Sequence, residues 1–315
     1  MNVLTITANP AVDKSTKTNL VMPEKKIRCH RPVYEPGGGG INVSRALKKL
    51  GSESTAMYFA GGSTGDRMHE LLVKEELHQN IIKTIAPVRE NLIVLDETDQ
   101  QHYRFGMPGP EIKEEEWKKM LDEIDKMGEE LSFVVLSGSL PPGVPEDFAA
   151  SIAQIAKRKD IKFITDTSGK SLKTALDEGV FLAKPNQLEL KNLMGEEKIK
   201  PGQLEIFARQ LVKDKKAEVM VVSLGAKGAL YATSGHSEYI MSPVIDTDSA
   251  VGAGDSMVAG MIHGFLHKKS VKEAVIYGIA AGTAATITPG TELCRRDDTD
   301  EVAAWIRKNE GMTES

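Results

Sequence analysis

Short apolar runs alternate with longer amphipathic stretches along most of the chain. The apolar runs predict strands at residues 3–7, 55–60, 133–136, 162–165, 181–183, 219–222 and 238–244. The stretches between and after them predict helices at residues 41–47, 66–77, 117–124, 147–157, 204–213 and 257–267. Such alternation is typical of a mainly parallel sheet covered by helices. Ligands of such folds bind beyond the carboxyl ends of the strands.

Two excursions interrupt this alternation. Residues 14–35 are polar and β-prone and contain Pro23 and Pro32. Further along, strands are predicted at residues 81–86, 91–95 and 102–105, with polar turns between them. We assign both excursions to a small β-sheet appendage outside the main core.

Composition and charge exclude several classes of protein. The chain has 315 residues, 40% of them apolar, which supports a sizeable core. There are 45 acidic and 40 basic residues, and the net charge of −5 argues against general nucleic-acid binding. Cys29 and Cys294 form no metal-ligand pattern and fit a reducing, cytoplasmic setting. We expect no signal peptide and no membrane span, because the longest apolar run, 274–287, suits a buried helix.

The strongest candidate for chemistry is Asp-Thr-Asp-Ser-Ala-Val-Gly-Ala-Gly-Asp-Ser at residues 246–256, between a strand-like and a helical segment. Gly252 and Gly254 let the backbone turn its N–H groups toward one point, where the helix start adds positive charge suited to a phosphate. Asp255 beside that anion would accept a proton from a hydroxyl that attacks phosphorus. The alternative is a plain helix start with Asp255 in its first turn.

A second group of residues suits a sugar. Gly38 and Gly39 would let a ligand approach the backbone, while Asp13 and Asn42 offer acceptors and donors for sugar hydroxyls. A glycine-rich turn with Asn42 in a helix start is the alternative.

Four basic residues in or near the polar excursions, Lys26, Arg28, Arg89 and Arg104, suit a phosphorylated substrate. Solvated surface charge is the alternative interpretation of each of them.

Two further segments suit a nucleotide and its metal. Residues 184–189, Lys-Pro-Asn-Gln-Leu-Glu, put Asn186 and Glu189 on one helix face, where they could hold Mg²⁺ through its waters. The alternative is a capping box at a helix start. Residues 221–229 end a strand in Ser-x-Gly and could carry a nucleotide phosphate or ribose, although a plain hairpin has the same pattern.

Two common nucleotide motifs are missing. The chain contains no Gly-x4-Gly-Lys-Ser/Thr, and Gly252-Ala253-Gly254 is followed by Met257 where a dinucleotide fingerprint needs its third glycine. A P-loop enzyme is thereby excluded and a nicotinamide dehydrogenase disfavoured.

The segments 37–43, 184–189, 222–225 and 251–256, in this order, resemble the ribokinase-like, PfkB-type sugar kinases. The resemblance covers essentially the whole chain. Glu-Pro-Gly-Gly-Gly-Gly-Ile-Asn-Val at 35–43, Tyr-Arg-Phe at 103–105 and Ser-Gly-Ser-Leu-Pro-Pro-Gly at 137–143 are most similar to the 6-phosphofructokinase branch of that family.

The resemblance implies one domain over residues 1–315, a three-layer α/β/α sandwich with a mainly parallel sheet. It also implies a β lid around 12–35 and 87–108, and a homodimer formed by pairing of two lids. Asp255 would be the catalytic base and Gly252, Ala253 and Gly254 the anion hole. The implied sugar-phosphate site comprises Asp13, Gly38, Gly39, Asn42, Arg89, Arg104 and Ser139, with Lys26 and Arg28 contributing across the dimer.

The implied cofactors are ATP and Mg²⁺, with a K⁺ site as a further family feature. Nucleotide contacts would come from Lys184, Asn186, Ser223, Gly225, Gly228 and Val251. Glu189 would serve Mg²⁺, while Ser249, Val251 and the 284–293 loop would surround K⁺.

The implied function is ATP-dependent phosphorylation of fructose 6-phosphate to fructose 1,6-bisphosphate. Tagatose-6-phosphate kinase and 1-phosphofructokinase are the alternatives within the family, and a catalytically inactive sugar-phosphate sensor is the alternative outside it. Relatives with the first two activities usually carry Gly-Gly-Lys-Gly at 37–40, so Gly39 in the lysine's place disfavours them.

Overall fold

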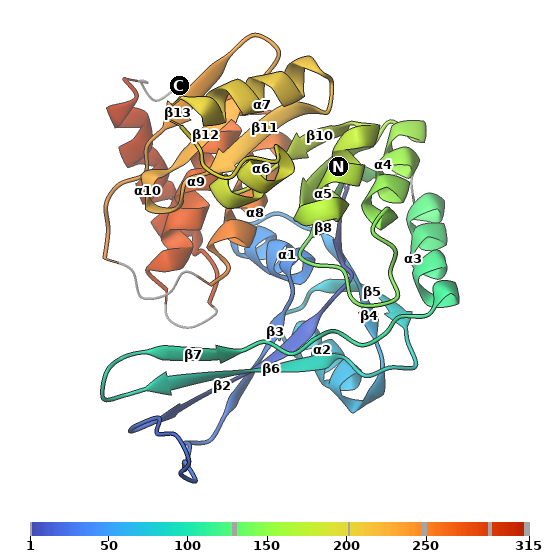
Figure 1. The fold of residues 1–315 in the computed structure, drawn as a ribbon, viewed down its shortest axis with the longest axis vertical. Helices are drawn as coiled ribbons and strands as arrows, with labels where there is room; N and C mark the ends of the chain where they lie inside the picture. The colour runs from blue at the N-terminus through green and yellow to red at the C-terminus, as the bar shows by residue number, and fades with distance from the viewer. Residues whose placement is uncertain (1, 128–130, 201, 247–250, 289–291, 312–315) are drawn as a thin grey trace.

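The computed structural model describes residues 2–127, 131–200, 202–246, 251–288 and 292–311 (Figure 1). These ranges contain a nine-stranded sheet, here sheet A, in the order β13-β12-β11-β10-β9-β8-β1-β4-β5. All neighbours pair in parallel except β12, which is antiparallel to both β11 and β13. In chain order the strands are β1 (Asn2–Thr7), β4 (Thr55–Ala60), β5 (His78–Lys83), β8 (Leu131–Ser137), β9 (Lys162–Asp166), β10 (Val180–Ala183), β11 (Ala217–Ser223), β12 (Ala229–Ala232) and β13 (Ser237–Ile240).

Helices cover both faces of sheet A and make it the middle of three layers. One face carries α3 (Glu114–Met127), α4 (Phe148–Arg158), α5 (Gly169–Glu178), α6 (Gln187–Leu193) and α7 (Gln203–Lys213). The other face carries α1 (Gly39–Lys49), α2 (Gly62–Lys74), α8 (Ala253–Leu266), α9 (Val271–Thr286) and α10 (Arg296–Asn309).

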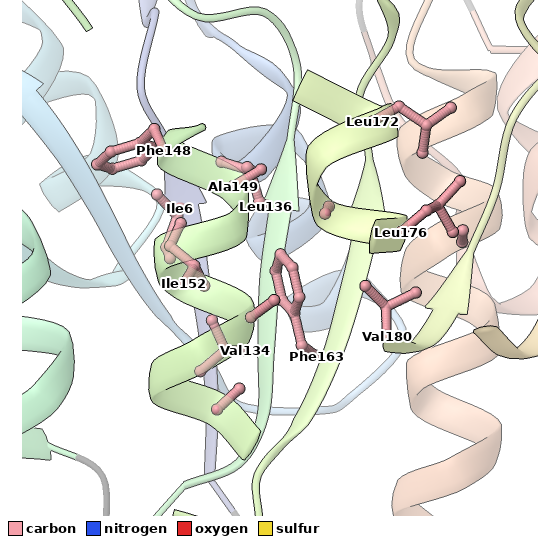
Figure 2. Close-up of a cluster of buried hydrophobic side chains, with 14 of the residues drawn as sticks. Ile6, Val134, Leu136, Phe148, Ala149, Ile152, Phe163, Leu172, Leu176 and Val180 are labelled. Carbon is pink, nitrogen blue, oxygen red and sulfur yellow. The ribbon is translucent and has the colours of Figure 1, made fainter. Parts of the chain in front are cut away.

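Buried side chains on both faces explain why the central strands are apolar throughout. In β8, Val134 and Leu136 point to the α3–α7 side, whereas Val135 points to the other side. Figure 2 shows the first of these cores, where Phe148 and Ile152 of α4 lie among Ile6 of β1 and Val134 and Leu136 of β8. The three-layer, mainly parallel fold predicted from the sequence is therefore present.

A four-stranded sheet, here sheet B, projects from one end of the described molecule (Figure 1). Its order is β3-β2-β6-β7, from β2 (Ala11–Thr18), β3 (Val33–Gly37), β6 (Arg89–Asp96) and β7 (His102–Phe105). Asp13 lies opposite Asn91, and Ile93 lies opposite Arg104. Because side chains alternate along a strand, Asp13, Asn91 and Arg104 occupy the same face of sheet B.

One strand was predicted in the wrong sheet. The strand expected at 81–86 in the appendage is β5, which pairs in parallel with β4 at the edge of sheet A. Ile82, on the inner face of β5, is buried in the main core. A local pattern of apolar residues does not specify the pairing partner of a strand, which explains the error.

Several element boundaries also differ from the predictions. Helix α2 spans 62–74 rather than 66–77, and α8 begins at Ala253 rather than at 257, which puts Asp255 in its first turn. Strand β13 ends at Ile240 instead of 244. Helices α5 and α10 and a 3₁₀ turn at Gly225–Lys227 were not predicted.

The apolar run near the C-terminus forms α9, which is buried along most of its length. No helix among the described residues combines the length and the hydrophobicity needed to cross a membrane.

Candidate active site

Polar side chains gather where neighbouring strands of sheet A end. Ser137, Asp166 and Ser223 are the last residues of β8, β9 and β11, and Lys184 follows β10 directly. These four strands are adjacent in the sheet, so their carboxyl ends lie along one edge. This edge is where ligands bind in parallel α/β sheets.

Asp255, in the first turn of α8, is the carboxylate held at this edge. Its Oδ2 accepts a hydrogen bond from Asn42 Nδ2 at 2.9 Å, and its Oδ1 accepts one from Ser137 Oγ at 3.2 Å. Burial raises the pKa of Asp255 to about 6, with a further rise from Asp166, against the opposing effects of Asn42, Lys184 and Ser137. A carboxylate with this pKa can accept a proton at neutral pH and release it again.

A buried ion pair lies beside the start of α8. Lys184 Nζ is 3.0 Å from Asp166 Oδ1, and the two side chains are 6% and 15% exposed. Burial opposes the charge on Lys184, but Asp166, and then Asp255 and Glu189, raise its pKa above the ordinary value. A side chain added at Gly254 would contact Lys184 Nζ at 3.6 Å. A permanent cation therefore adjoins the N–H groups of a helix start, which suits an anion.

The turn into α8 requires glycine at its first position. Gly252 is the N-cap and has φ +73°, a conformation that other residues rarely adopt. A Cβ there would also lie 2.4 Å from Leu293 Cδ2. Gly254, in contrast, is exposed at the edge of the site.

Asp13 lies at the base of sheet B, on the sugar side of the predicted site. Its Oδ1 accepts a hydrogen bond from Asn91 Nδ2 at 2.8 Å. Burial raises its pKa, and the Asn91 hydrogen bond and the Arg89 charge oppose that rise. The glycine-rich segment runs alongside, because Gly37 would place a Cβ 2.4 Å from Asp13 Oδ2.

At Gly39, α1 lies very close to the end of β8. A Cβ at this position would lie 2.4 Å from Ser137 Oγ and 2.6 Å from the Ser137 carbonyl carbon. The backbone as observed leaves no room there for any side chain, lysine included. Gly38, the N-cap of α1, lies beside it.

Arg89, Ser139 and a residue that was not predicted, Asn9, form a polar wall. Arg89 donates to the carbonyls of Met107 at 2.8 Å and Asn9 at 3.1 Å, and Asn9 Nδ2 donates to Ser139 Oγ at 3.1 Å. Burial lowers the pKa of Arg89, although Asp13 opposes this. Asn9 Oδ1 and Arg89 Nε are buried without a hydrogen-bond partner among the described residues. Asn9 belongs to the Asn-Pro pair after β1, so a polar residue at a strand end was the available signal.

Three predicted site residues lie outside this cluster. Arg104 is on the Asp13 face of sheet B but two strands away, and its side chain is exposed. Lys26 and Arg28 lie exposed in the connection between β2 and β3. Within one chain the structure does not bring these cations to Asp255.

A pocket of about 350 Å³ opens on the other side of the α8 start. It includes Ser223, Gly225 and Gly228, as predicted, and reaches Ala253 and Gly254. The rest of its wall was not predicted and consists of Ala226, the segment 242–245, Met257, and Ile279, Gly282, Thr283 and Thr286 of α9. The small residues of the segment that forms α9 were the available signal for this wall. They let α9 approach the start of α8, because a Cβ at Gly282 would lie 3.0 Å from the Ala253 carbonyl oxygen.

Asn186 and Glu189 form the capping box that the sequence left as an alternative. Asn186 Oδ1 accepts from the Glu189 backbone N–H, and Glu189 Oε2 accepts from the Asn186 backbone N–H, both at 2.8 Å. The backbone of Asn186 also forms an isolated parallel β-bridge with Ser223, beside the pocket. Ser249 lies outside the described residues, whereas Val251 is part of the turn into α8.

Among the described residues, no three His, Cys, Asp or Glu side chains come together as a metal site.

The fold and the site together define a class. A pocket for a small molecule and a polar wall lie on either side of a helix start, with a proton-accepting carboxylate between them. This arrangement is that of a small-molecule kinase, in which the protein positions two substrates and stabilises the charge on the transferred phosphoryl group.

Comparison with known proteins agrees with this class. The profile described as "pfkB family carbohydrate kinase" matches residues 3–298, so the chain belongs to that family. It is 39% identical to ATP-dependent 6-phosphofructokinase isozyme 2 of Escherichia coli K12, over 98% of this chain and all of the relative. It is 41% identical to the isozyme 2 of Mycobacterium tuberculosis, over 95% of this chain and 88% of the relative.

Solved structures agree as well. The E. coli phosphofructokinase-2 structure in complex with fructose-6-phosphate has a TM-score of 0.90 at 38% identity, covering 97% of this chain and 98% of that one. Ribokinase from Thermotoga maritima has a TM-score of 0.75 at 19% identity, which supports the fold alone. The predicted family and the ribokinase-like fold are both confirmed.

The raised pKa of Asp255 predicts a cost in stability. Its pKa is about 6 in the folded chain and 3.8 ordinarily, so at pH 8 the folded state carries a charge that burial disfavours by about 3 kcal/mol. At pH 4.5 the folded group is mostly protonated and the cost falls to about 1 kcal/mol. Asp255→Asn should therefore raise the free energy of unfolding, and more at pH 8 than at pH 4.5. Urea titrations at the two pH values measure this, and an equal effect at both would contradict it.

Proposed function

We propose that this protein transfers the γ-phosphoryl group of ATP to fructose 6-phosphate and forms fructose 1,6-bisphosphate. The observation that carries the proposal is the position of Asp255, between the α9-lined pocket and the Asp13 side of the site. The names of the E. coli and M. tuberculosis relatives and the fructose-6-phosphate complex of the former support this choice of substrates.

In this proposal Asp255 removes the proton from the attacking sugar hydroxyl while transfer proceeds in line from donor to acceptor. The N–H groups at Gly252, Ala253 and Gly254 face the phosphoryl oxygens, where negative charge accumulates in the transition state. Lys184 lies beside that helix start and adds a buried cation. No covalent intermediate on the protein is needed.

The acceptor would lie between sheet B and the α8 start. Asp13 and Asn42 have the polar groups to bind its hydroxyls, and Gly38 and Gly39 line its backbone side. Its phosphate would meet the polar wall near Arg89 and Ser139, where Arg89 Nε has no hydrogen-bond partner among the described residues. Arg104, exposed on the same face, would reach this phosphate when substrate is bound, with Lys26 and Arg28 supplied by a partner chain.

ATP would occupy the 350 Å³ pocket beside Ser223, Gly225 and Gly228, with Asn186, Lys184 and Val251 toward its phosphates. Mg²⁺ fits this arrangement, because it is usually held by substrate phosphates, waters and one or two carboxylates. Glu189 would hold it through water, and the metal would neutralise phosphate charge. For K⁺ we propose Val251, Ser249 and the 284–293 loop. A structure of the E. coli relative in complex with potassium supports this.

We further propose that residues 1–315 act as one domain, in which sheet B and its connections, 12–35 and 87–108, form a lid. Two lids would pair in a homodimer. The edges of sheet B support this, because Val33 on β3 and Phe105 on β7 are 61% and 47% exposed. One structure of the E. coli relative is described as tetrameric. A cytoplasmic location, where ATP is available, completes the proposal.

Two other activities of the family remain as alternatives to 6-phosphofructokinase activity. The chain is 32% identical to 1-phosphofructokinase of Bacillus subtilis and 31% identical to tagatose-6-phosphate kinase of Staphylococcus epidermidis, lower than to the 6-phosphofructokinases. An inactive sensor would have no need of a base with a pKa near 6. A substrate panel separates all three.

The panel should contain fructose 6-phosphate, fructose 1-phosphate, tagatose 6-phosphate and free fructose, assayed by ATP consumption. A hydrogen bond to a charged group contributes roughly 1.5–3 kcal/mol, so several phosphate contacts predict at least a ~1000-fold preference for fructose 6-phosphate over fructose in kcat/KM. Arg104→Ala should reduce this preference for fructose 6-phosphate over fructose. Asp255→Asn should fold normally but lose at least ~100-fold in turnover. A better rate with tagatose 6-phosphate or fructose would contradict the assignment.

Glu189 can be tested without breaking the helix start. Glu189→Gln keeps an acceptor at the third helical position and preserves the capping box, but it removes the charge. We expect the Mg²⁺ concentration for half-maximal rate to rise several-fold while the melting temperature stays within about a degree of wild type. Glu189→Ala should change both. An unchanged Mg²⁺ titration in the glutamine variant would assign Glu189 to helix capping alone.

Light scattering should give at least twice the 34.3 kDa chain mass at assay concentration. Phe105→Glu, on the exposed edge strand β7, should shift the protein toward monomer because two charges would be buried per dimer. Ile206→Glu, which alters an even more exposed apolar residue on α7, is the control and should leave the mass unchanged. A wild-type monomer would refute lid pairing and any contribution of Lys26 or Arg28 in trans.

A further inference from the structure

A chain of hydrogen bonds leads from Asp255 to a buried arginine that no motif assigned. Asn42 donates from Nδ2 to Asp255 Oδ2 at 2.9 Å, and its other end, Oδ1, accepts from Arg45 Nη1 at 3.5 Å. Asn42 and Arg45 are three residues apart on α1 and share a helix face. Arg45 therefore acts on Asn42 from the side opposite Asp255.

The end of α2 and strand β3 hold the Arg45 guanidinium in place. Its Nε donates to both carboxylate oxygens of Glu75, at 3.0 and 2.8 Å, just beyond the end of α2. Its Nη1 also donates to the Pro36 carbonyl of β3 at 3.1 Å. The Arg45 side chain is only 6% exposed. A buried cation with this many partners has a fixed position.

We propose that Arg45 is a positioning residue for phosphoryl transfer, which orients the Asn42 amide so that it donates to Asp255. The two ends of an amide differ, because the oxygen accepts and the nitrogen donates. A reversed Asn42 would set its oxygen against the Asp255 carboxylate and its N–H groups against the Arg45 donors. Both contacts would be repulsive, so the cation on one side and the carboxylate on the other select one orientation.

This proposal rests on the proposed role of Asp255 as the base and predicts a change in its titration. The Asn42 hydrogen bond stabilises the ionised carboxylate and lowers its pKa. The other groups that face Asp255 are Asp166 of β9, which raises the pKa, and Lys184 and Ser137, which lower it. Loss of Arg45 should release Asn42 and raise the pKa of Asp255 by about one unit, while the other three groups remain.

The test compares kcat against pH in wild type, Arg45→Met, Asn42→Ala and the double variant. In Arg45→Met the acidic limb should move up by about one pH unit, so that kcat falls about fivefold at pH 6 and stays nearly unchanged at pH 8.5. In the double variant, Arg45→Met should add no further shift to that of Asn42→Ala. A role in stability alone would not move the limb.

Lys48→Met is the matched control. Lys48 lies one turn farther along α1, where its Nζ donates to the Glu76 carbonyl at 2.7 Å and contacts the Glu76 carboxylate at 3.4 Å. The control removes a cation between the same two helices without touching Asn42, and the acidic limb should stay in place.

An unmoved limb in folded Arg45→Met, or a shift that adds to that of Asn42→Ala, overturns the proposal. Arg45→Gln, shorter and neutral, replaces Arg45→Met under the same criteria if the methionine variant does not fold. A wild type inactive on fructose 6-phosphate would contradict the proposed function instead. In that case the free energy of unfolding at pH 8 tests the positioning role. Asp255→Asn should raise it more in the Arg45→Met protein than in wild type, and an equal rise in both would refute the role.

Discussion

The site depends on burying Asp255 between charges of opposite sign. Burial raises the pKa of Asp255 and Asp166 raises it further, whereas Asn42, Lys184 and Ser137 oppose that rise. The Lys184–Asp166 pair therefore acts on the pKa of Asp255 in both directions, and the pKa that results is about 6. Neither member of the pair can be removed alone, because an unpaired buried charge costs several kcal/mol.

That requirement also explains the backbone around the site. Asn42 reaches Asp255 only because α1 begins against the end of β8, where a Cβ at Gly39 would collide with Ser137. The glycine run at 37–40 therefore allows the start of α1 to contact the sheet closely. Its lack of side chains brings Asn42 and Ser137 to the same carboxylate.

Much of this could be predicted from the sequence, and the failures have physical causes. The alternation of strands and helices gave the layers, and the Gly-x-Gly-Asp pattern located Asp255. Asp166 was missed because one aspartate after a strand has no motif, and only the adjacency of β9 and β10 places it against Lys184. Arg45 was missed because a cation on an amphipathic helix looks like surface charge in a sequence. Lys26 and Arg28 were named from their charge and their place in the polar excursion, and the role across a dimer that the resemblance implies for them depends on a second chain.

Glu189 shows why a structural and a functional interpretation of one residue need not compete. The capping box uses Glu189 Oε2 and fixes the side chain against the Asn186 backbone. A carboxylate held this way would lose little further rotamer freedom if it met a hydrated metal, as the proposed role of Glu189 requires. The charge of Glu189 already acts on Lys184, beside the start of α8. The hydrogen bond that satisfies the Asn186 backbone N–H at the start of α6 therefore also holds a negative charge near the place where phosphates and their metal would lie.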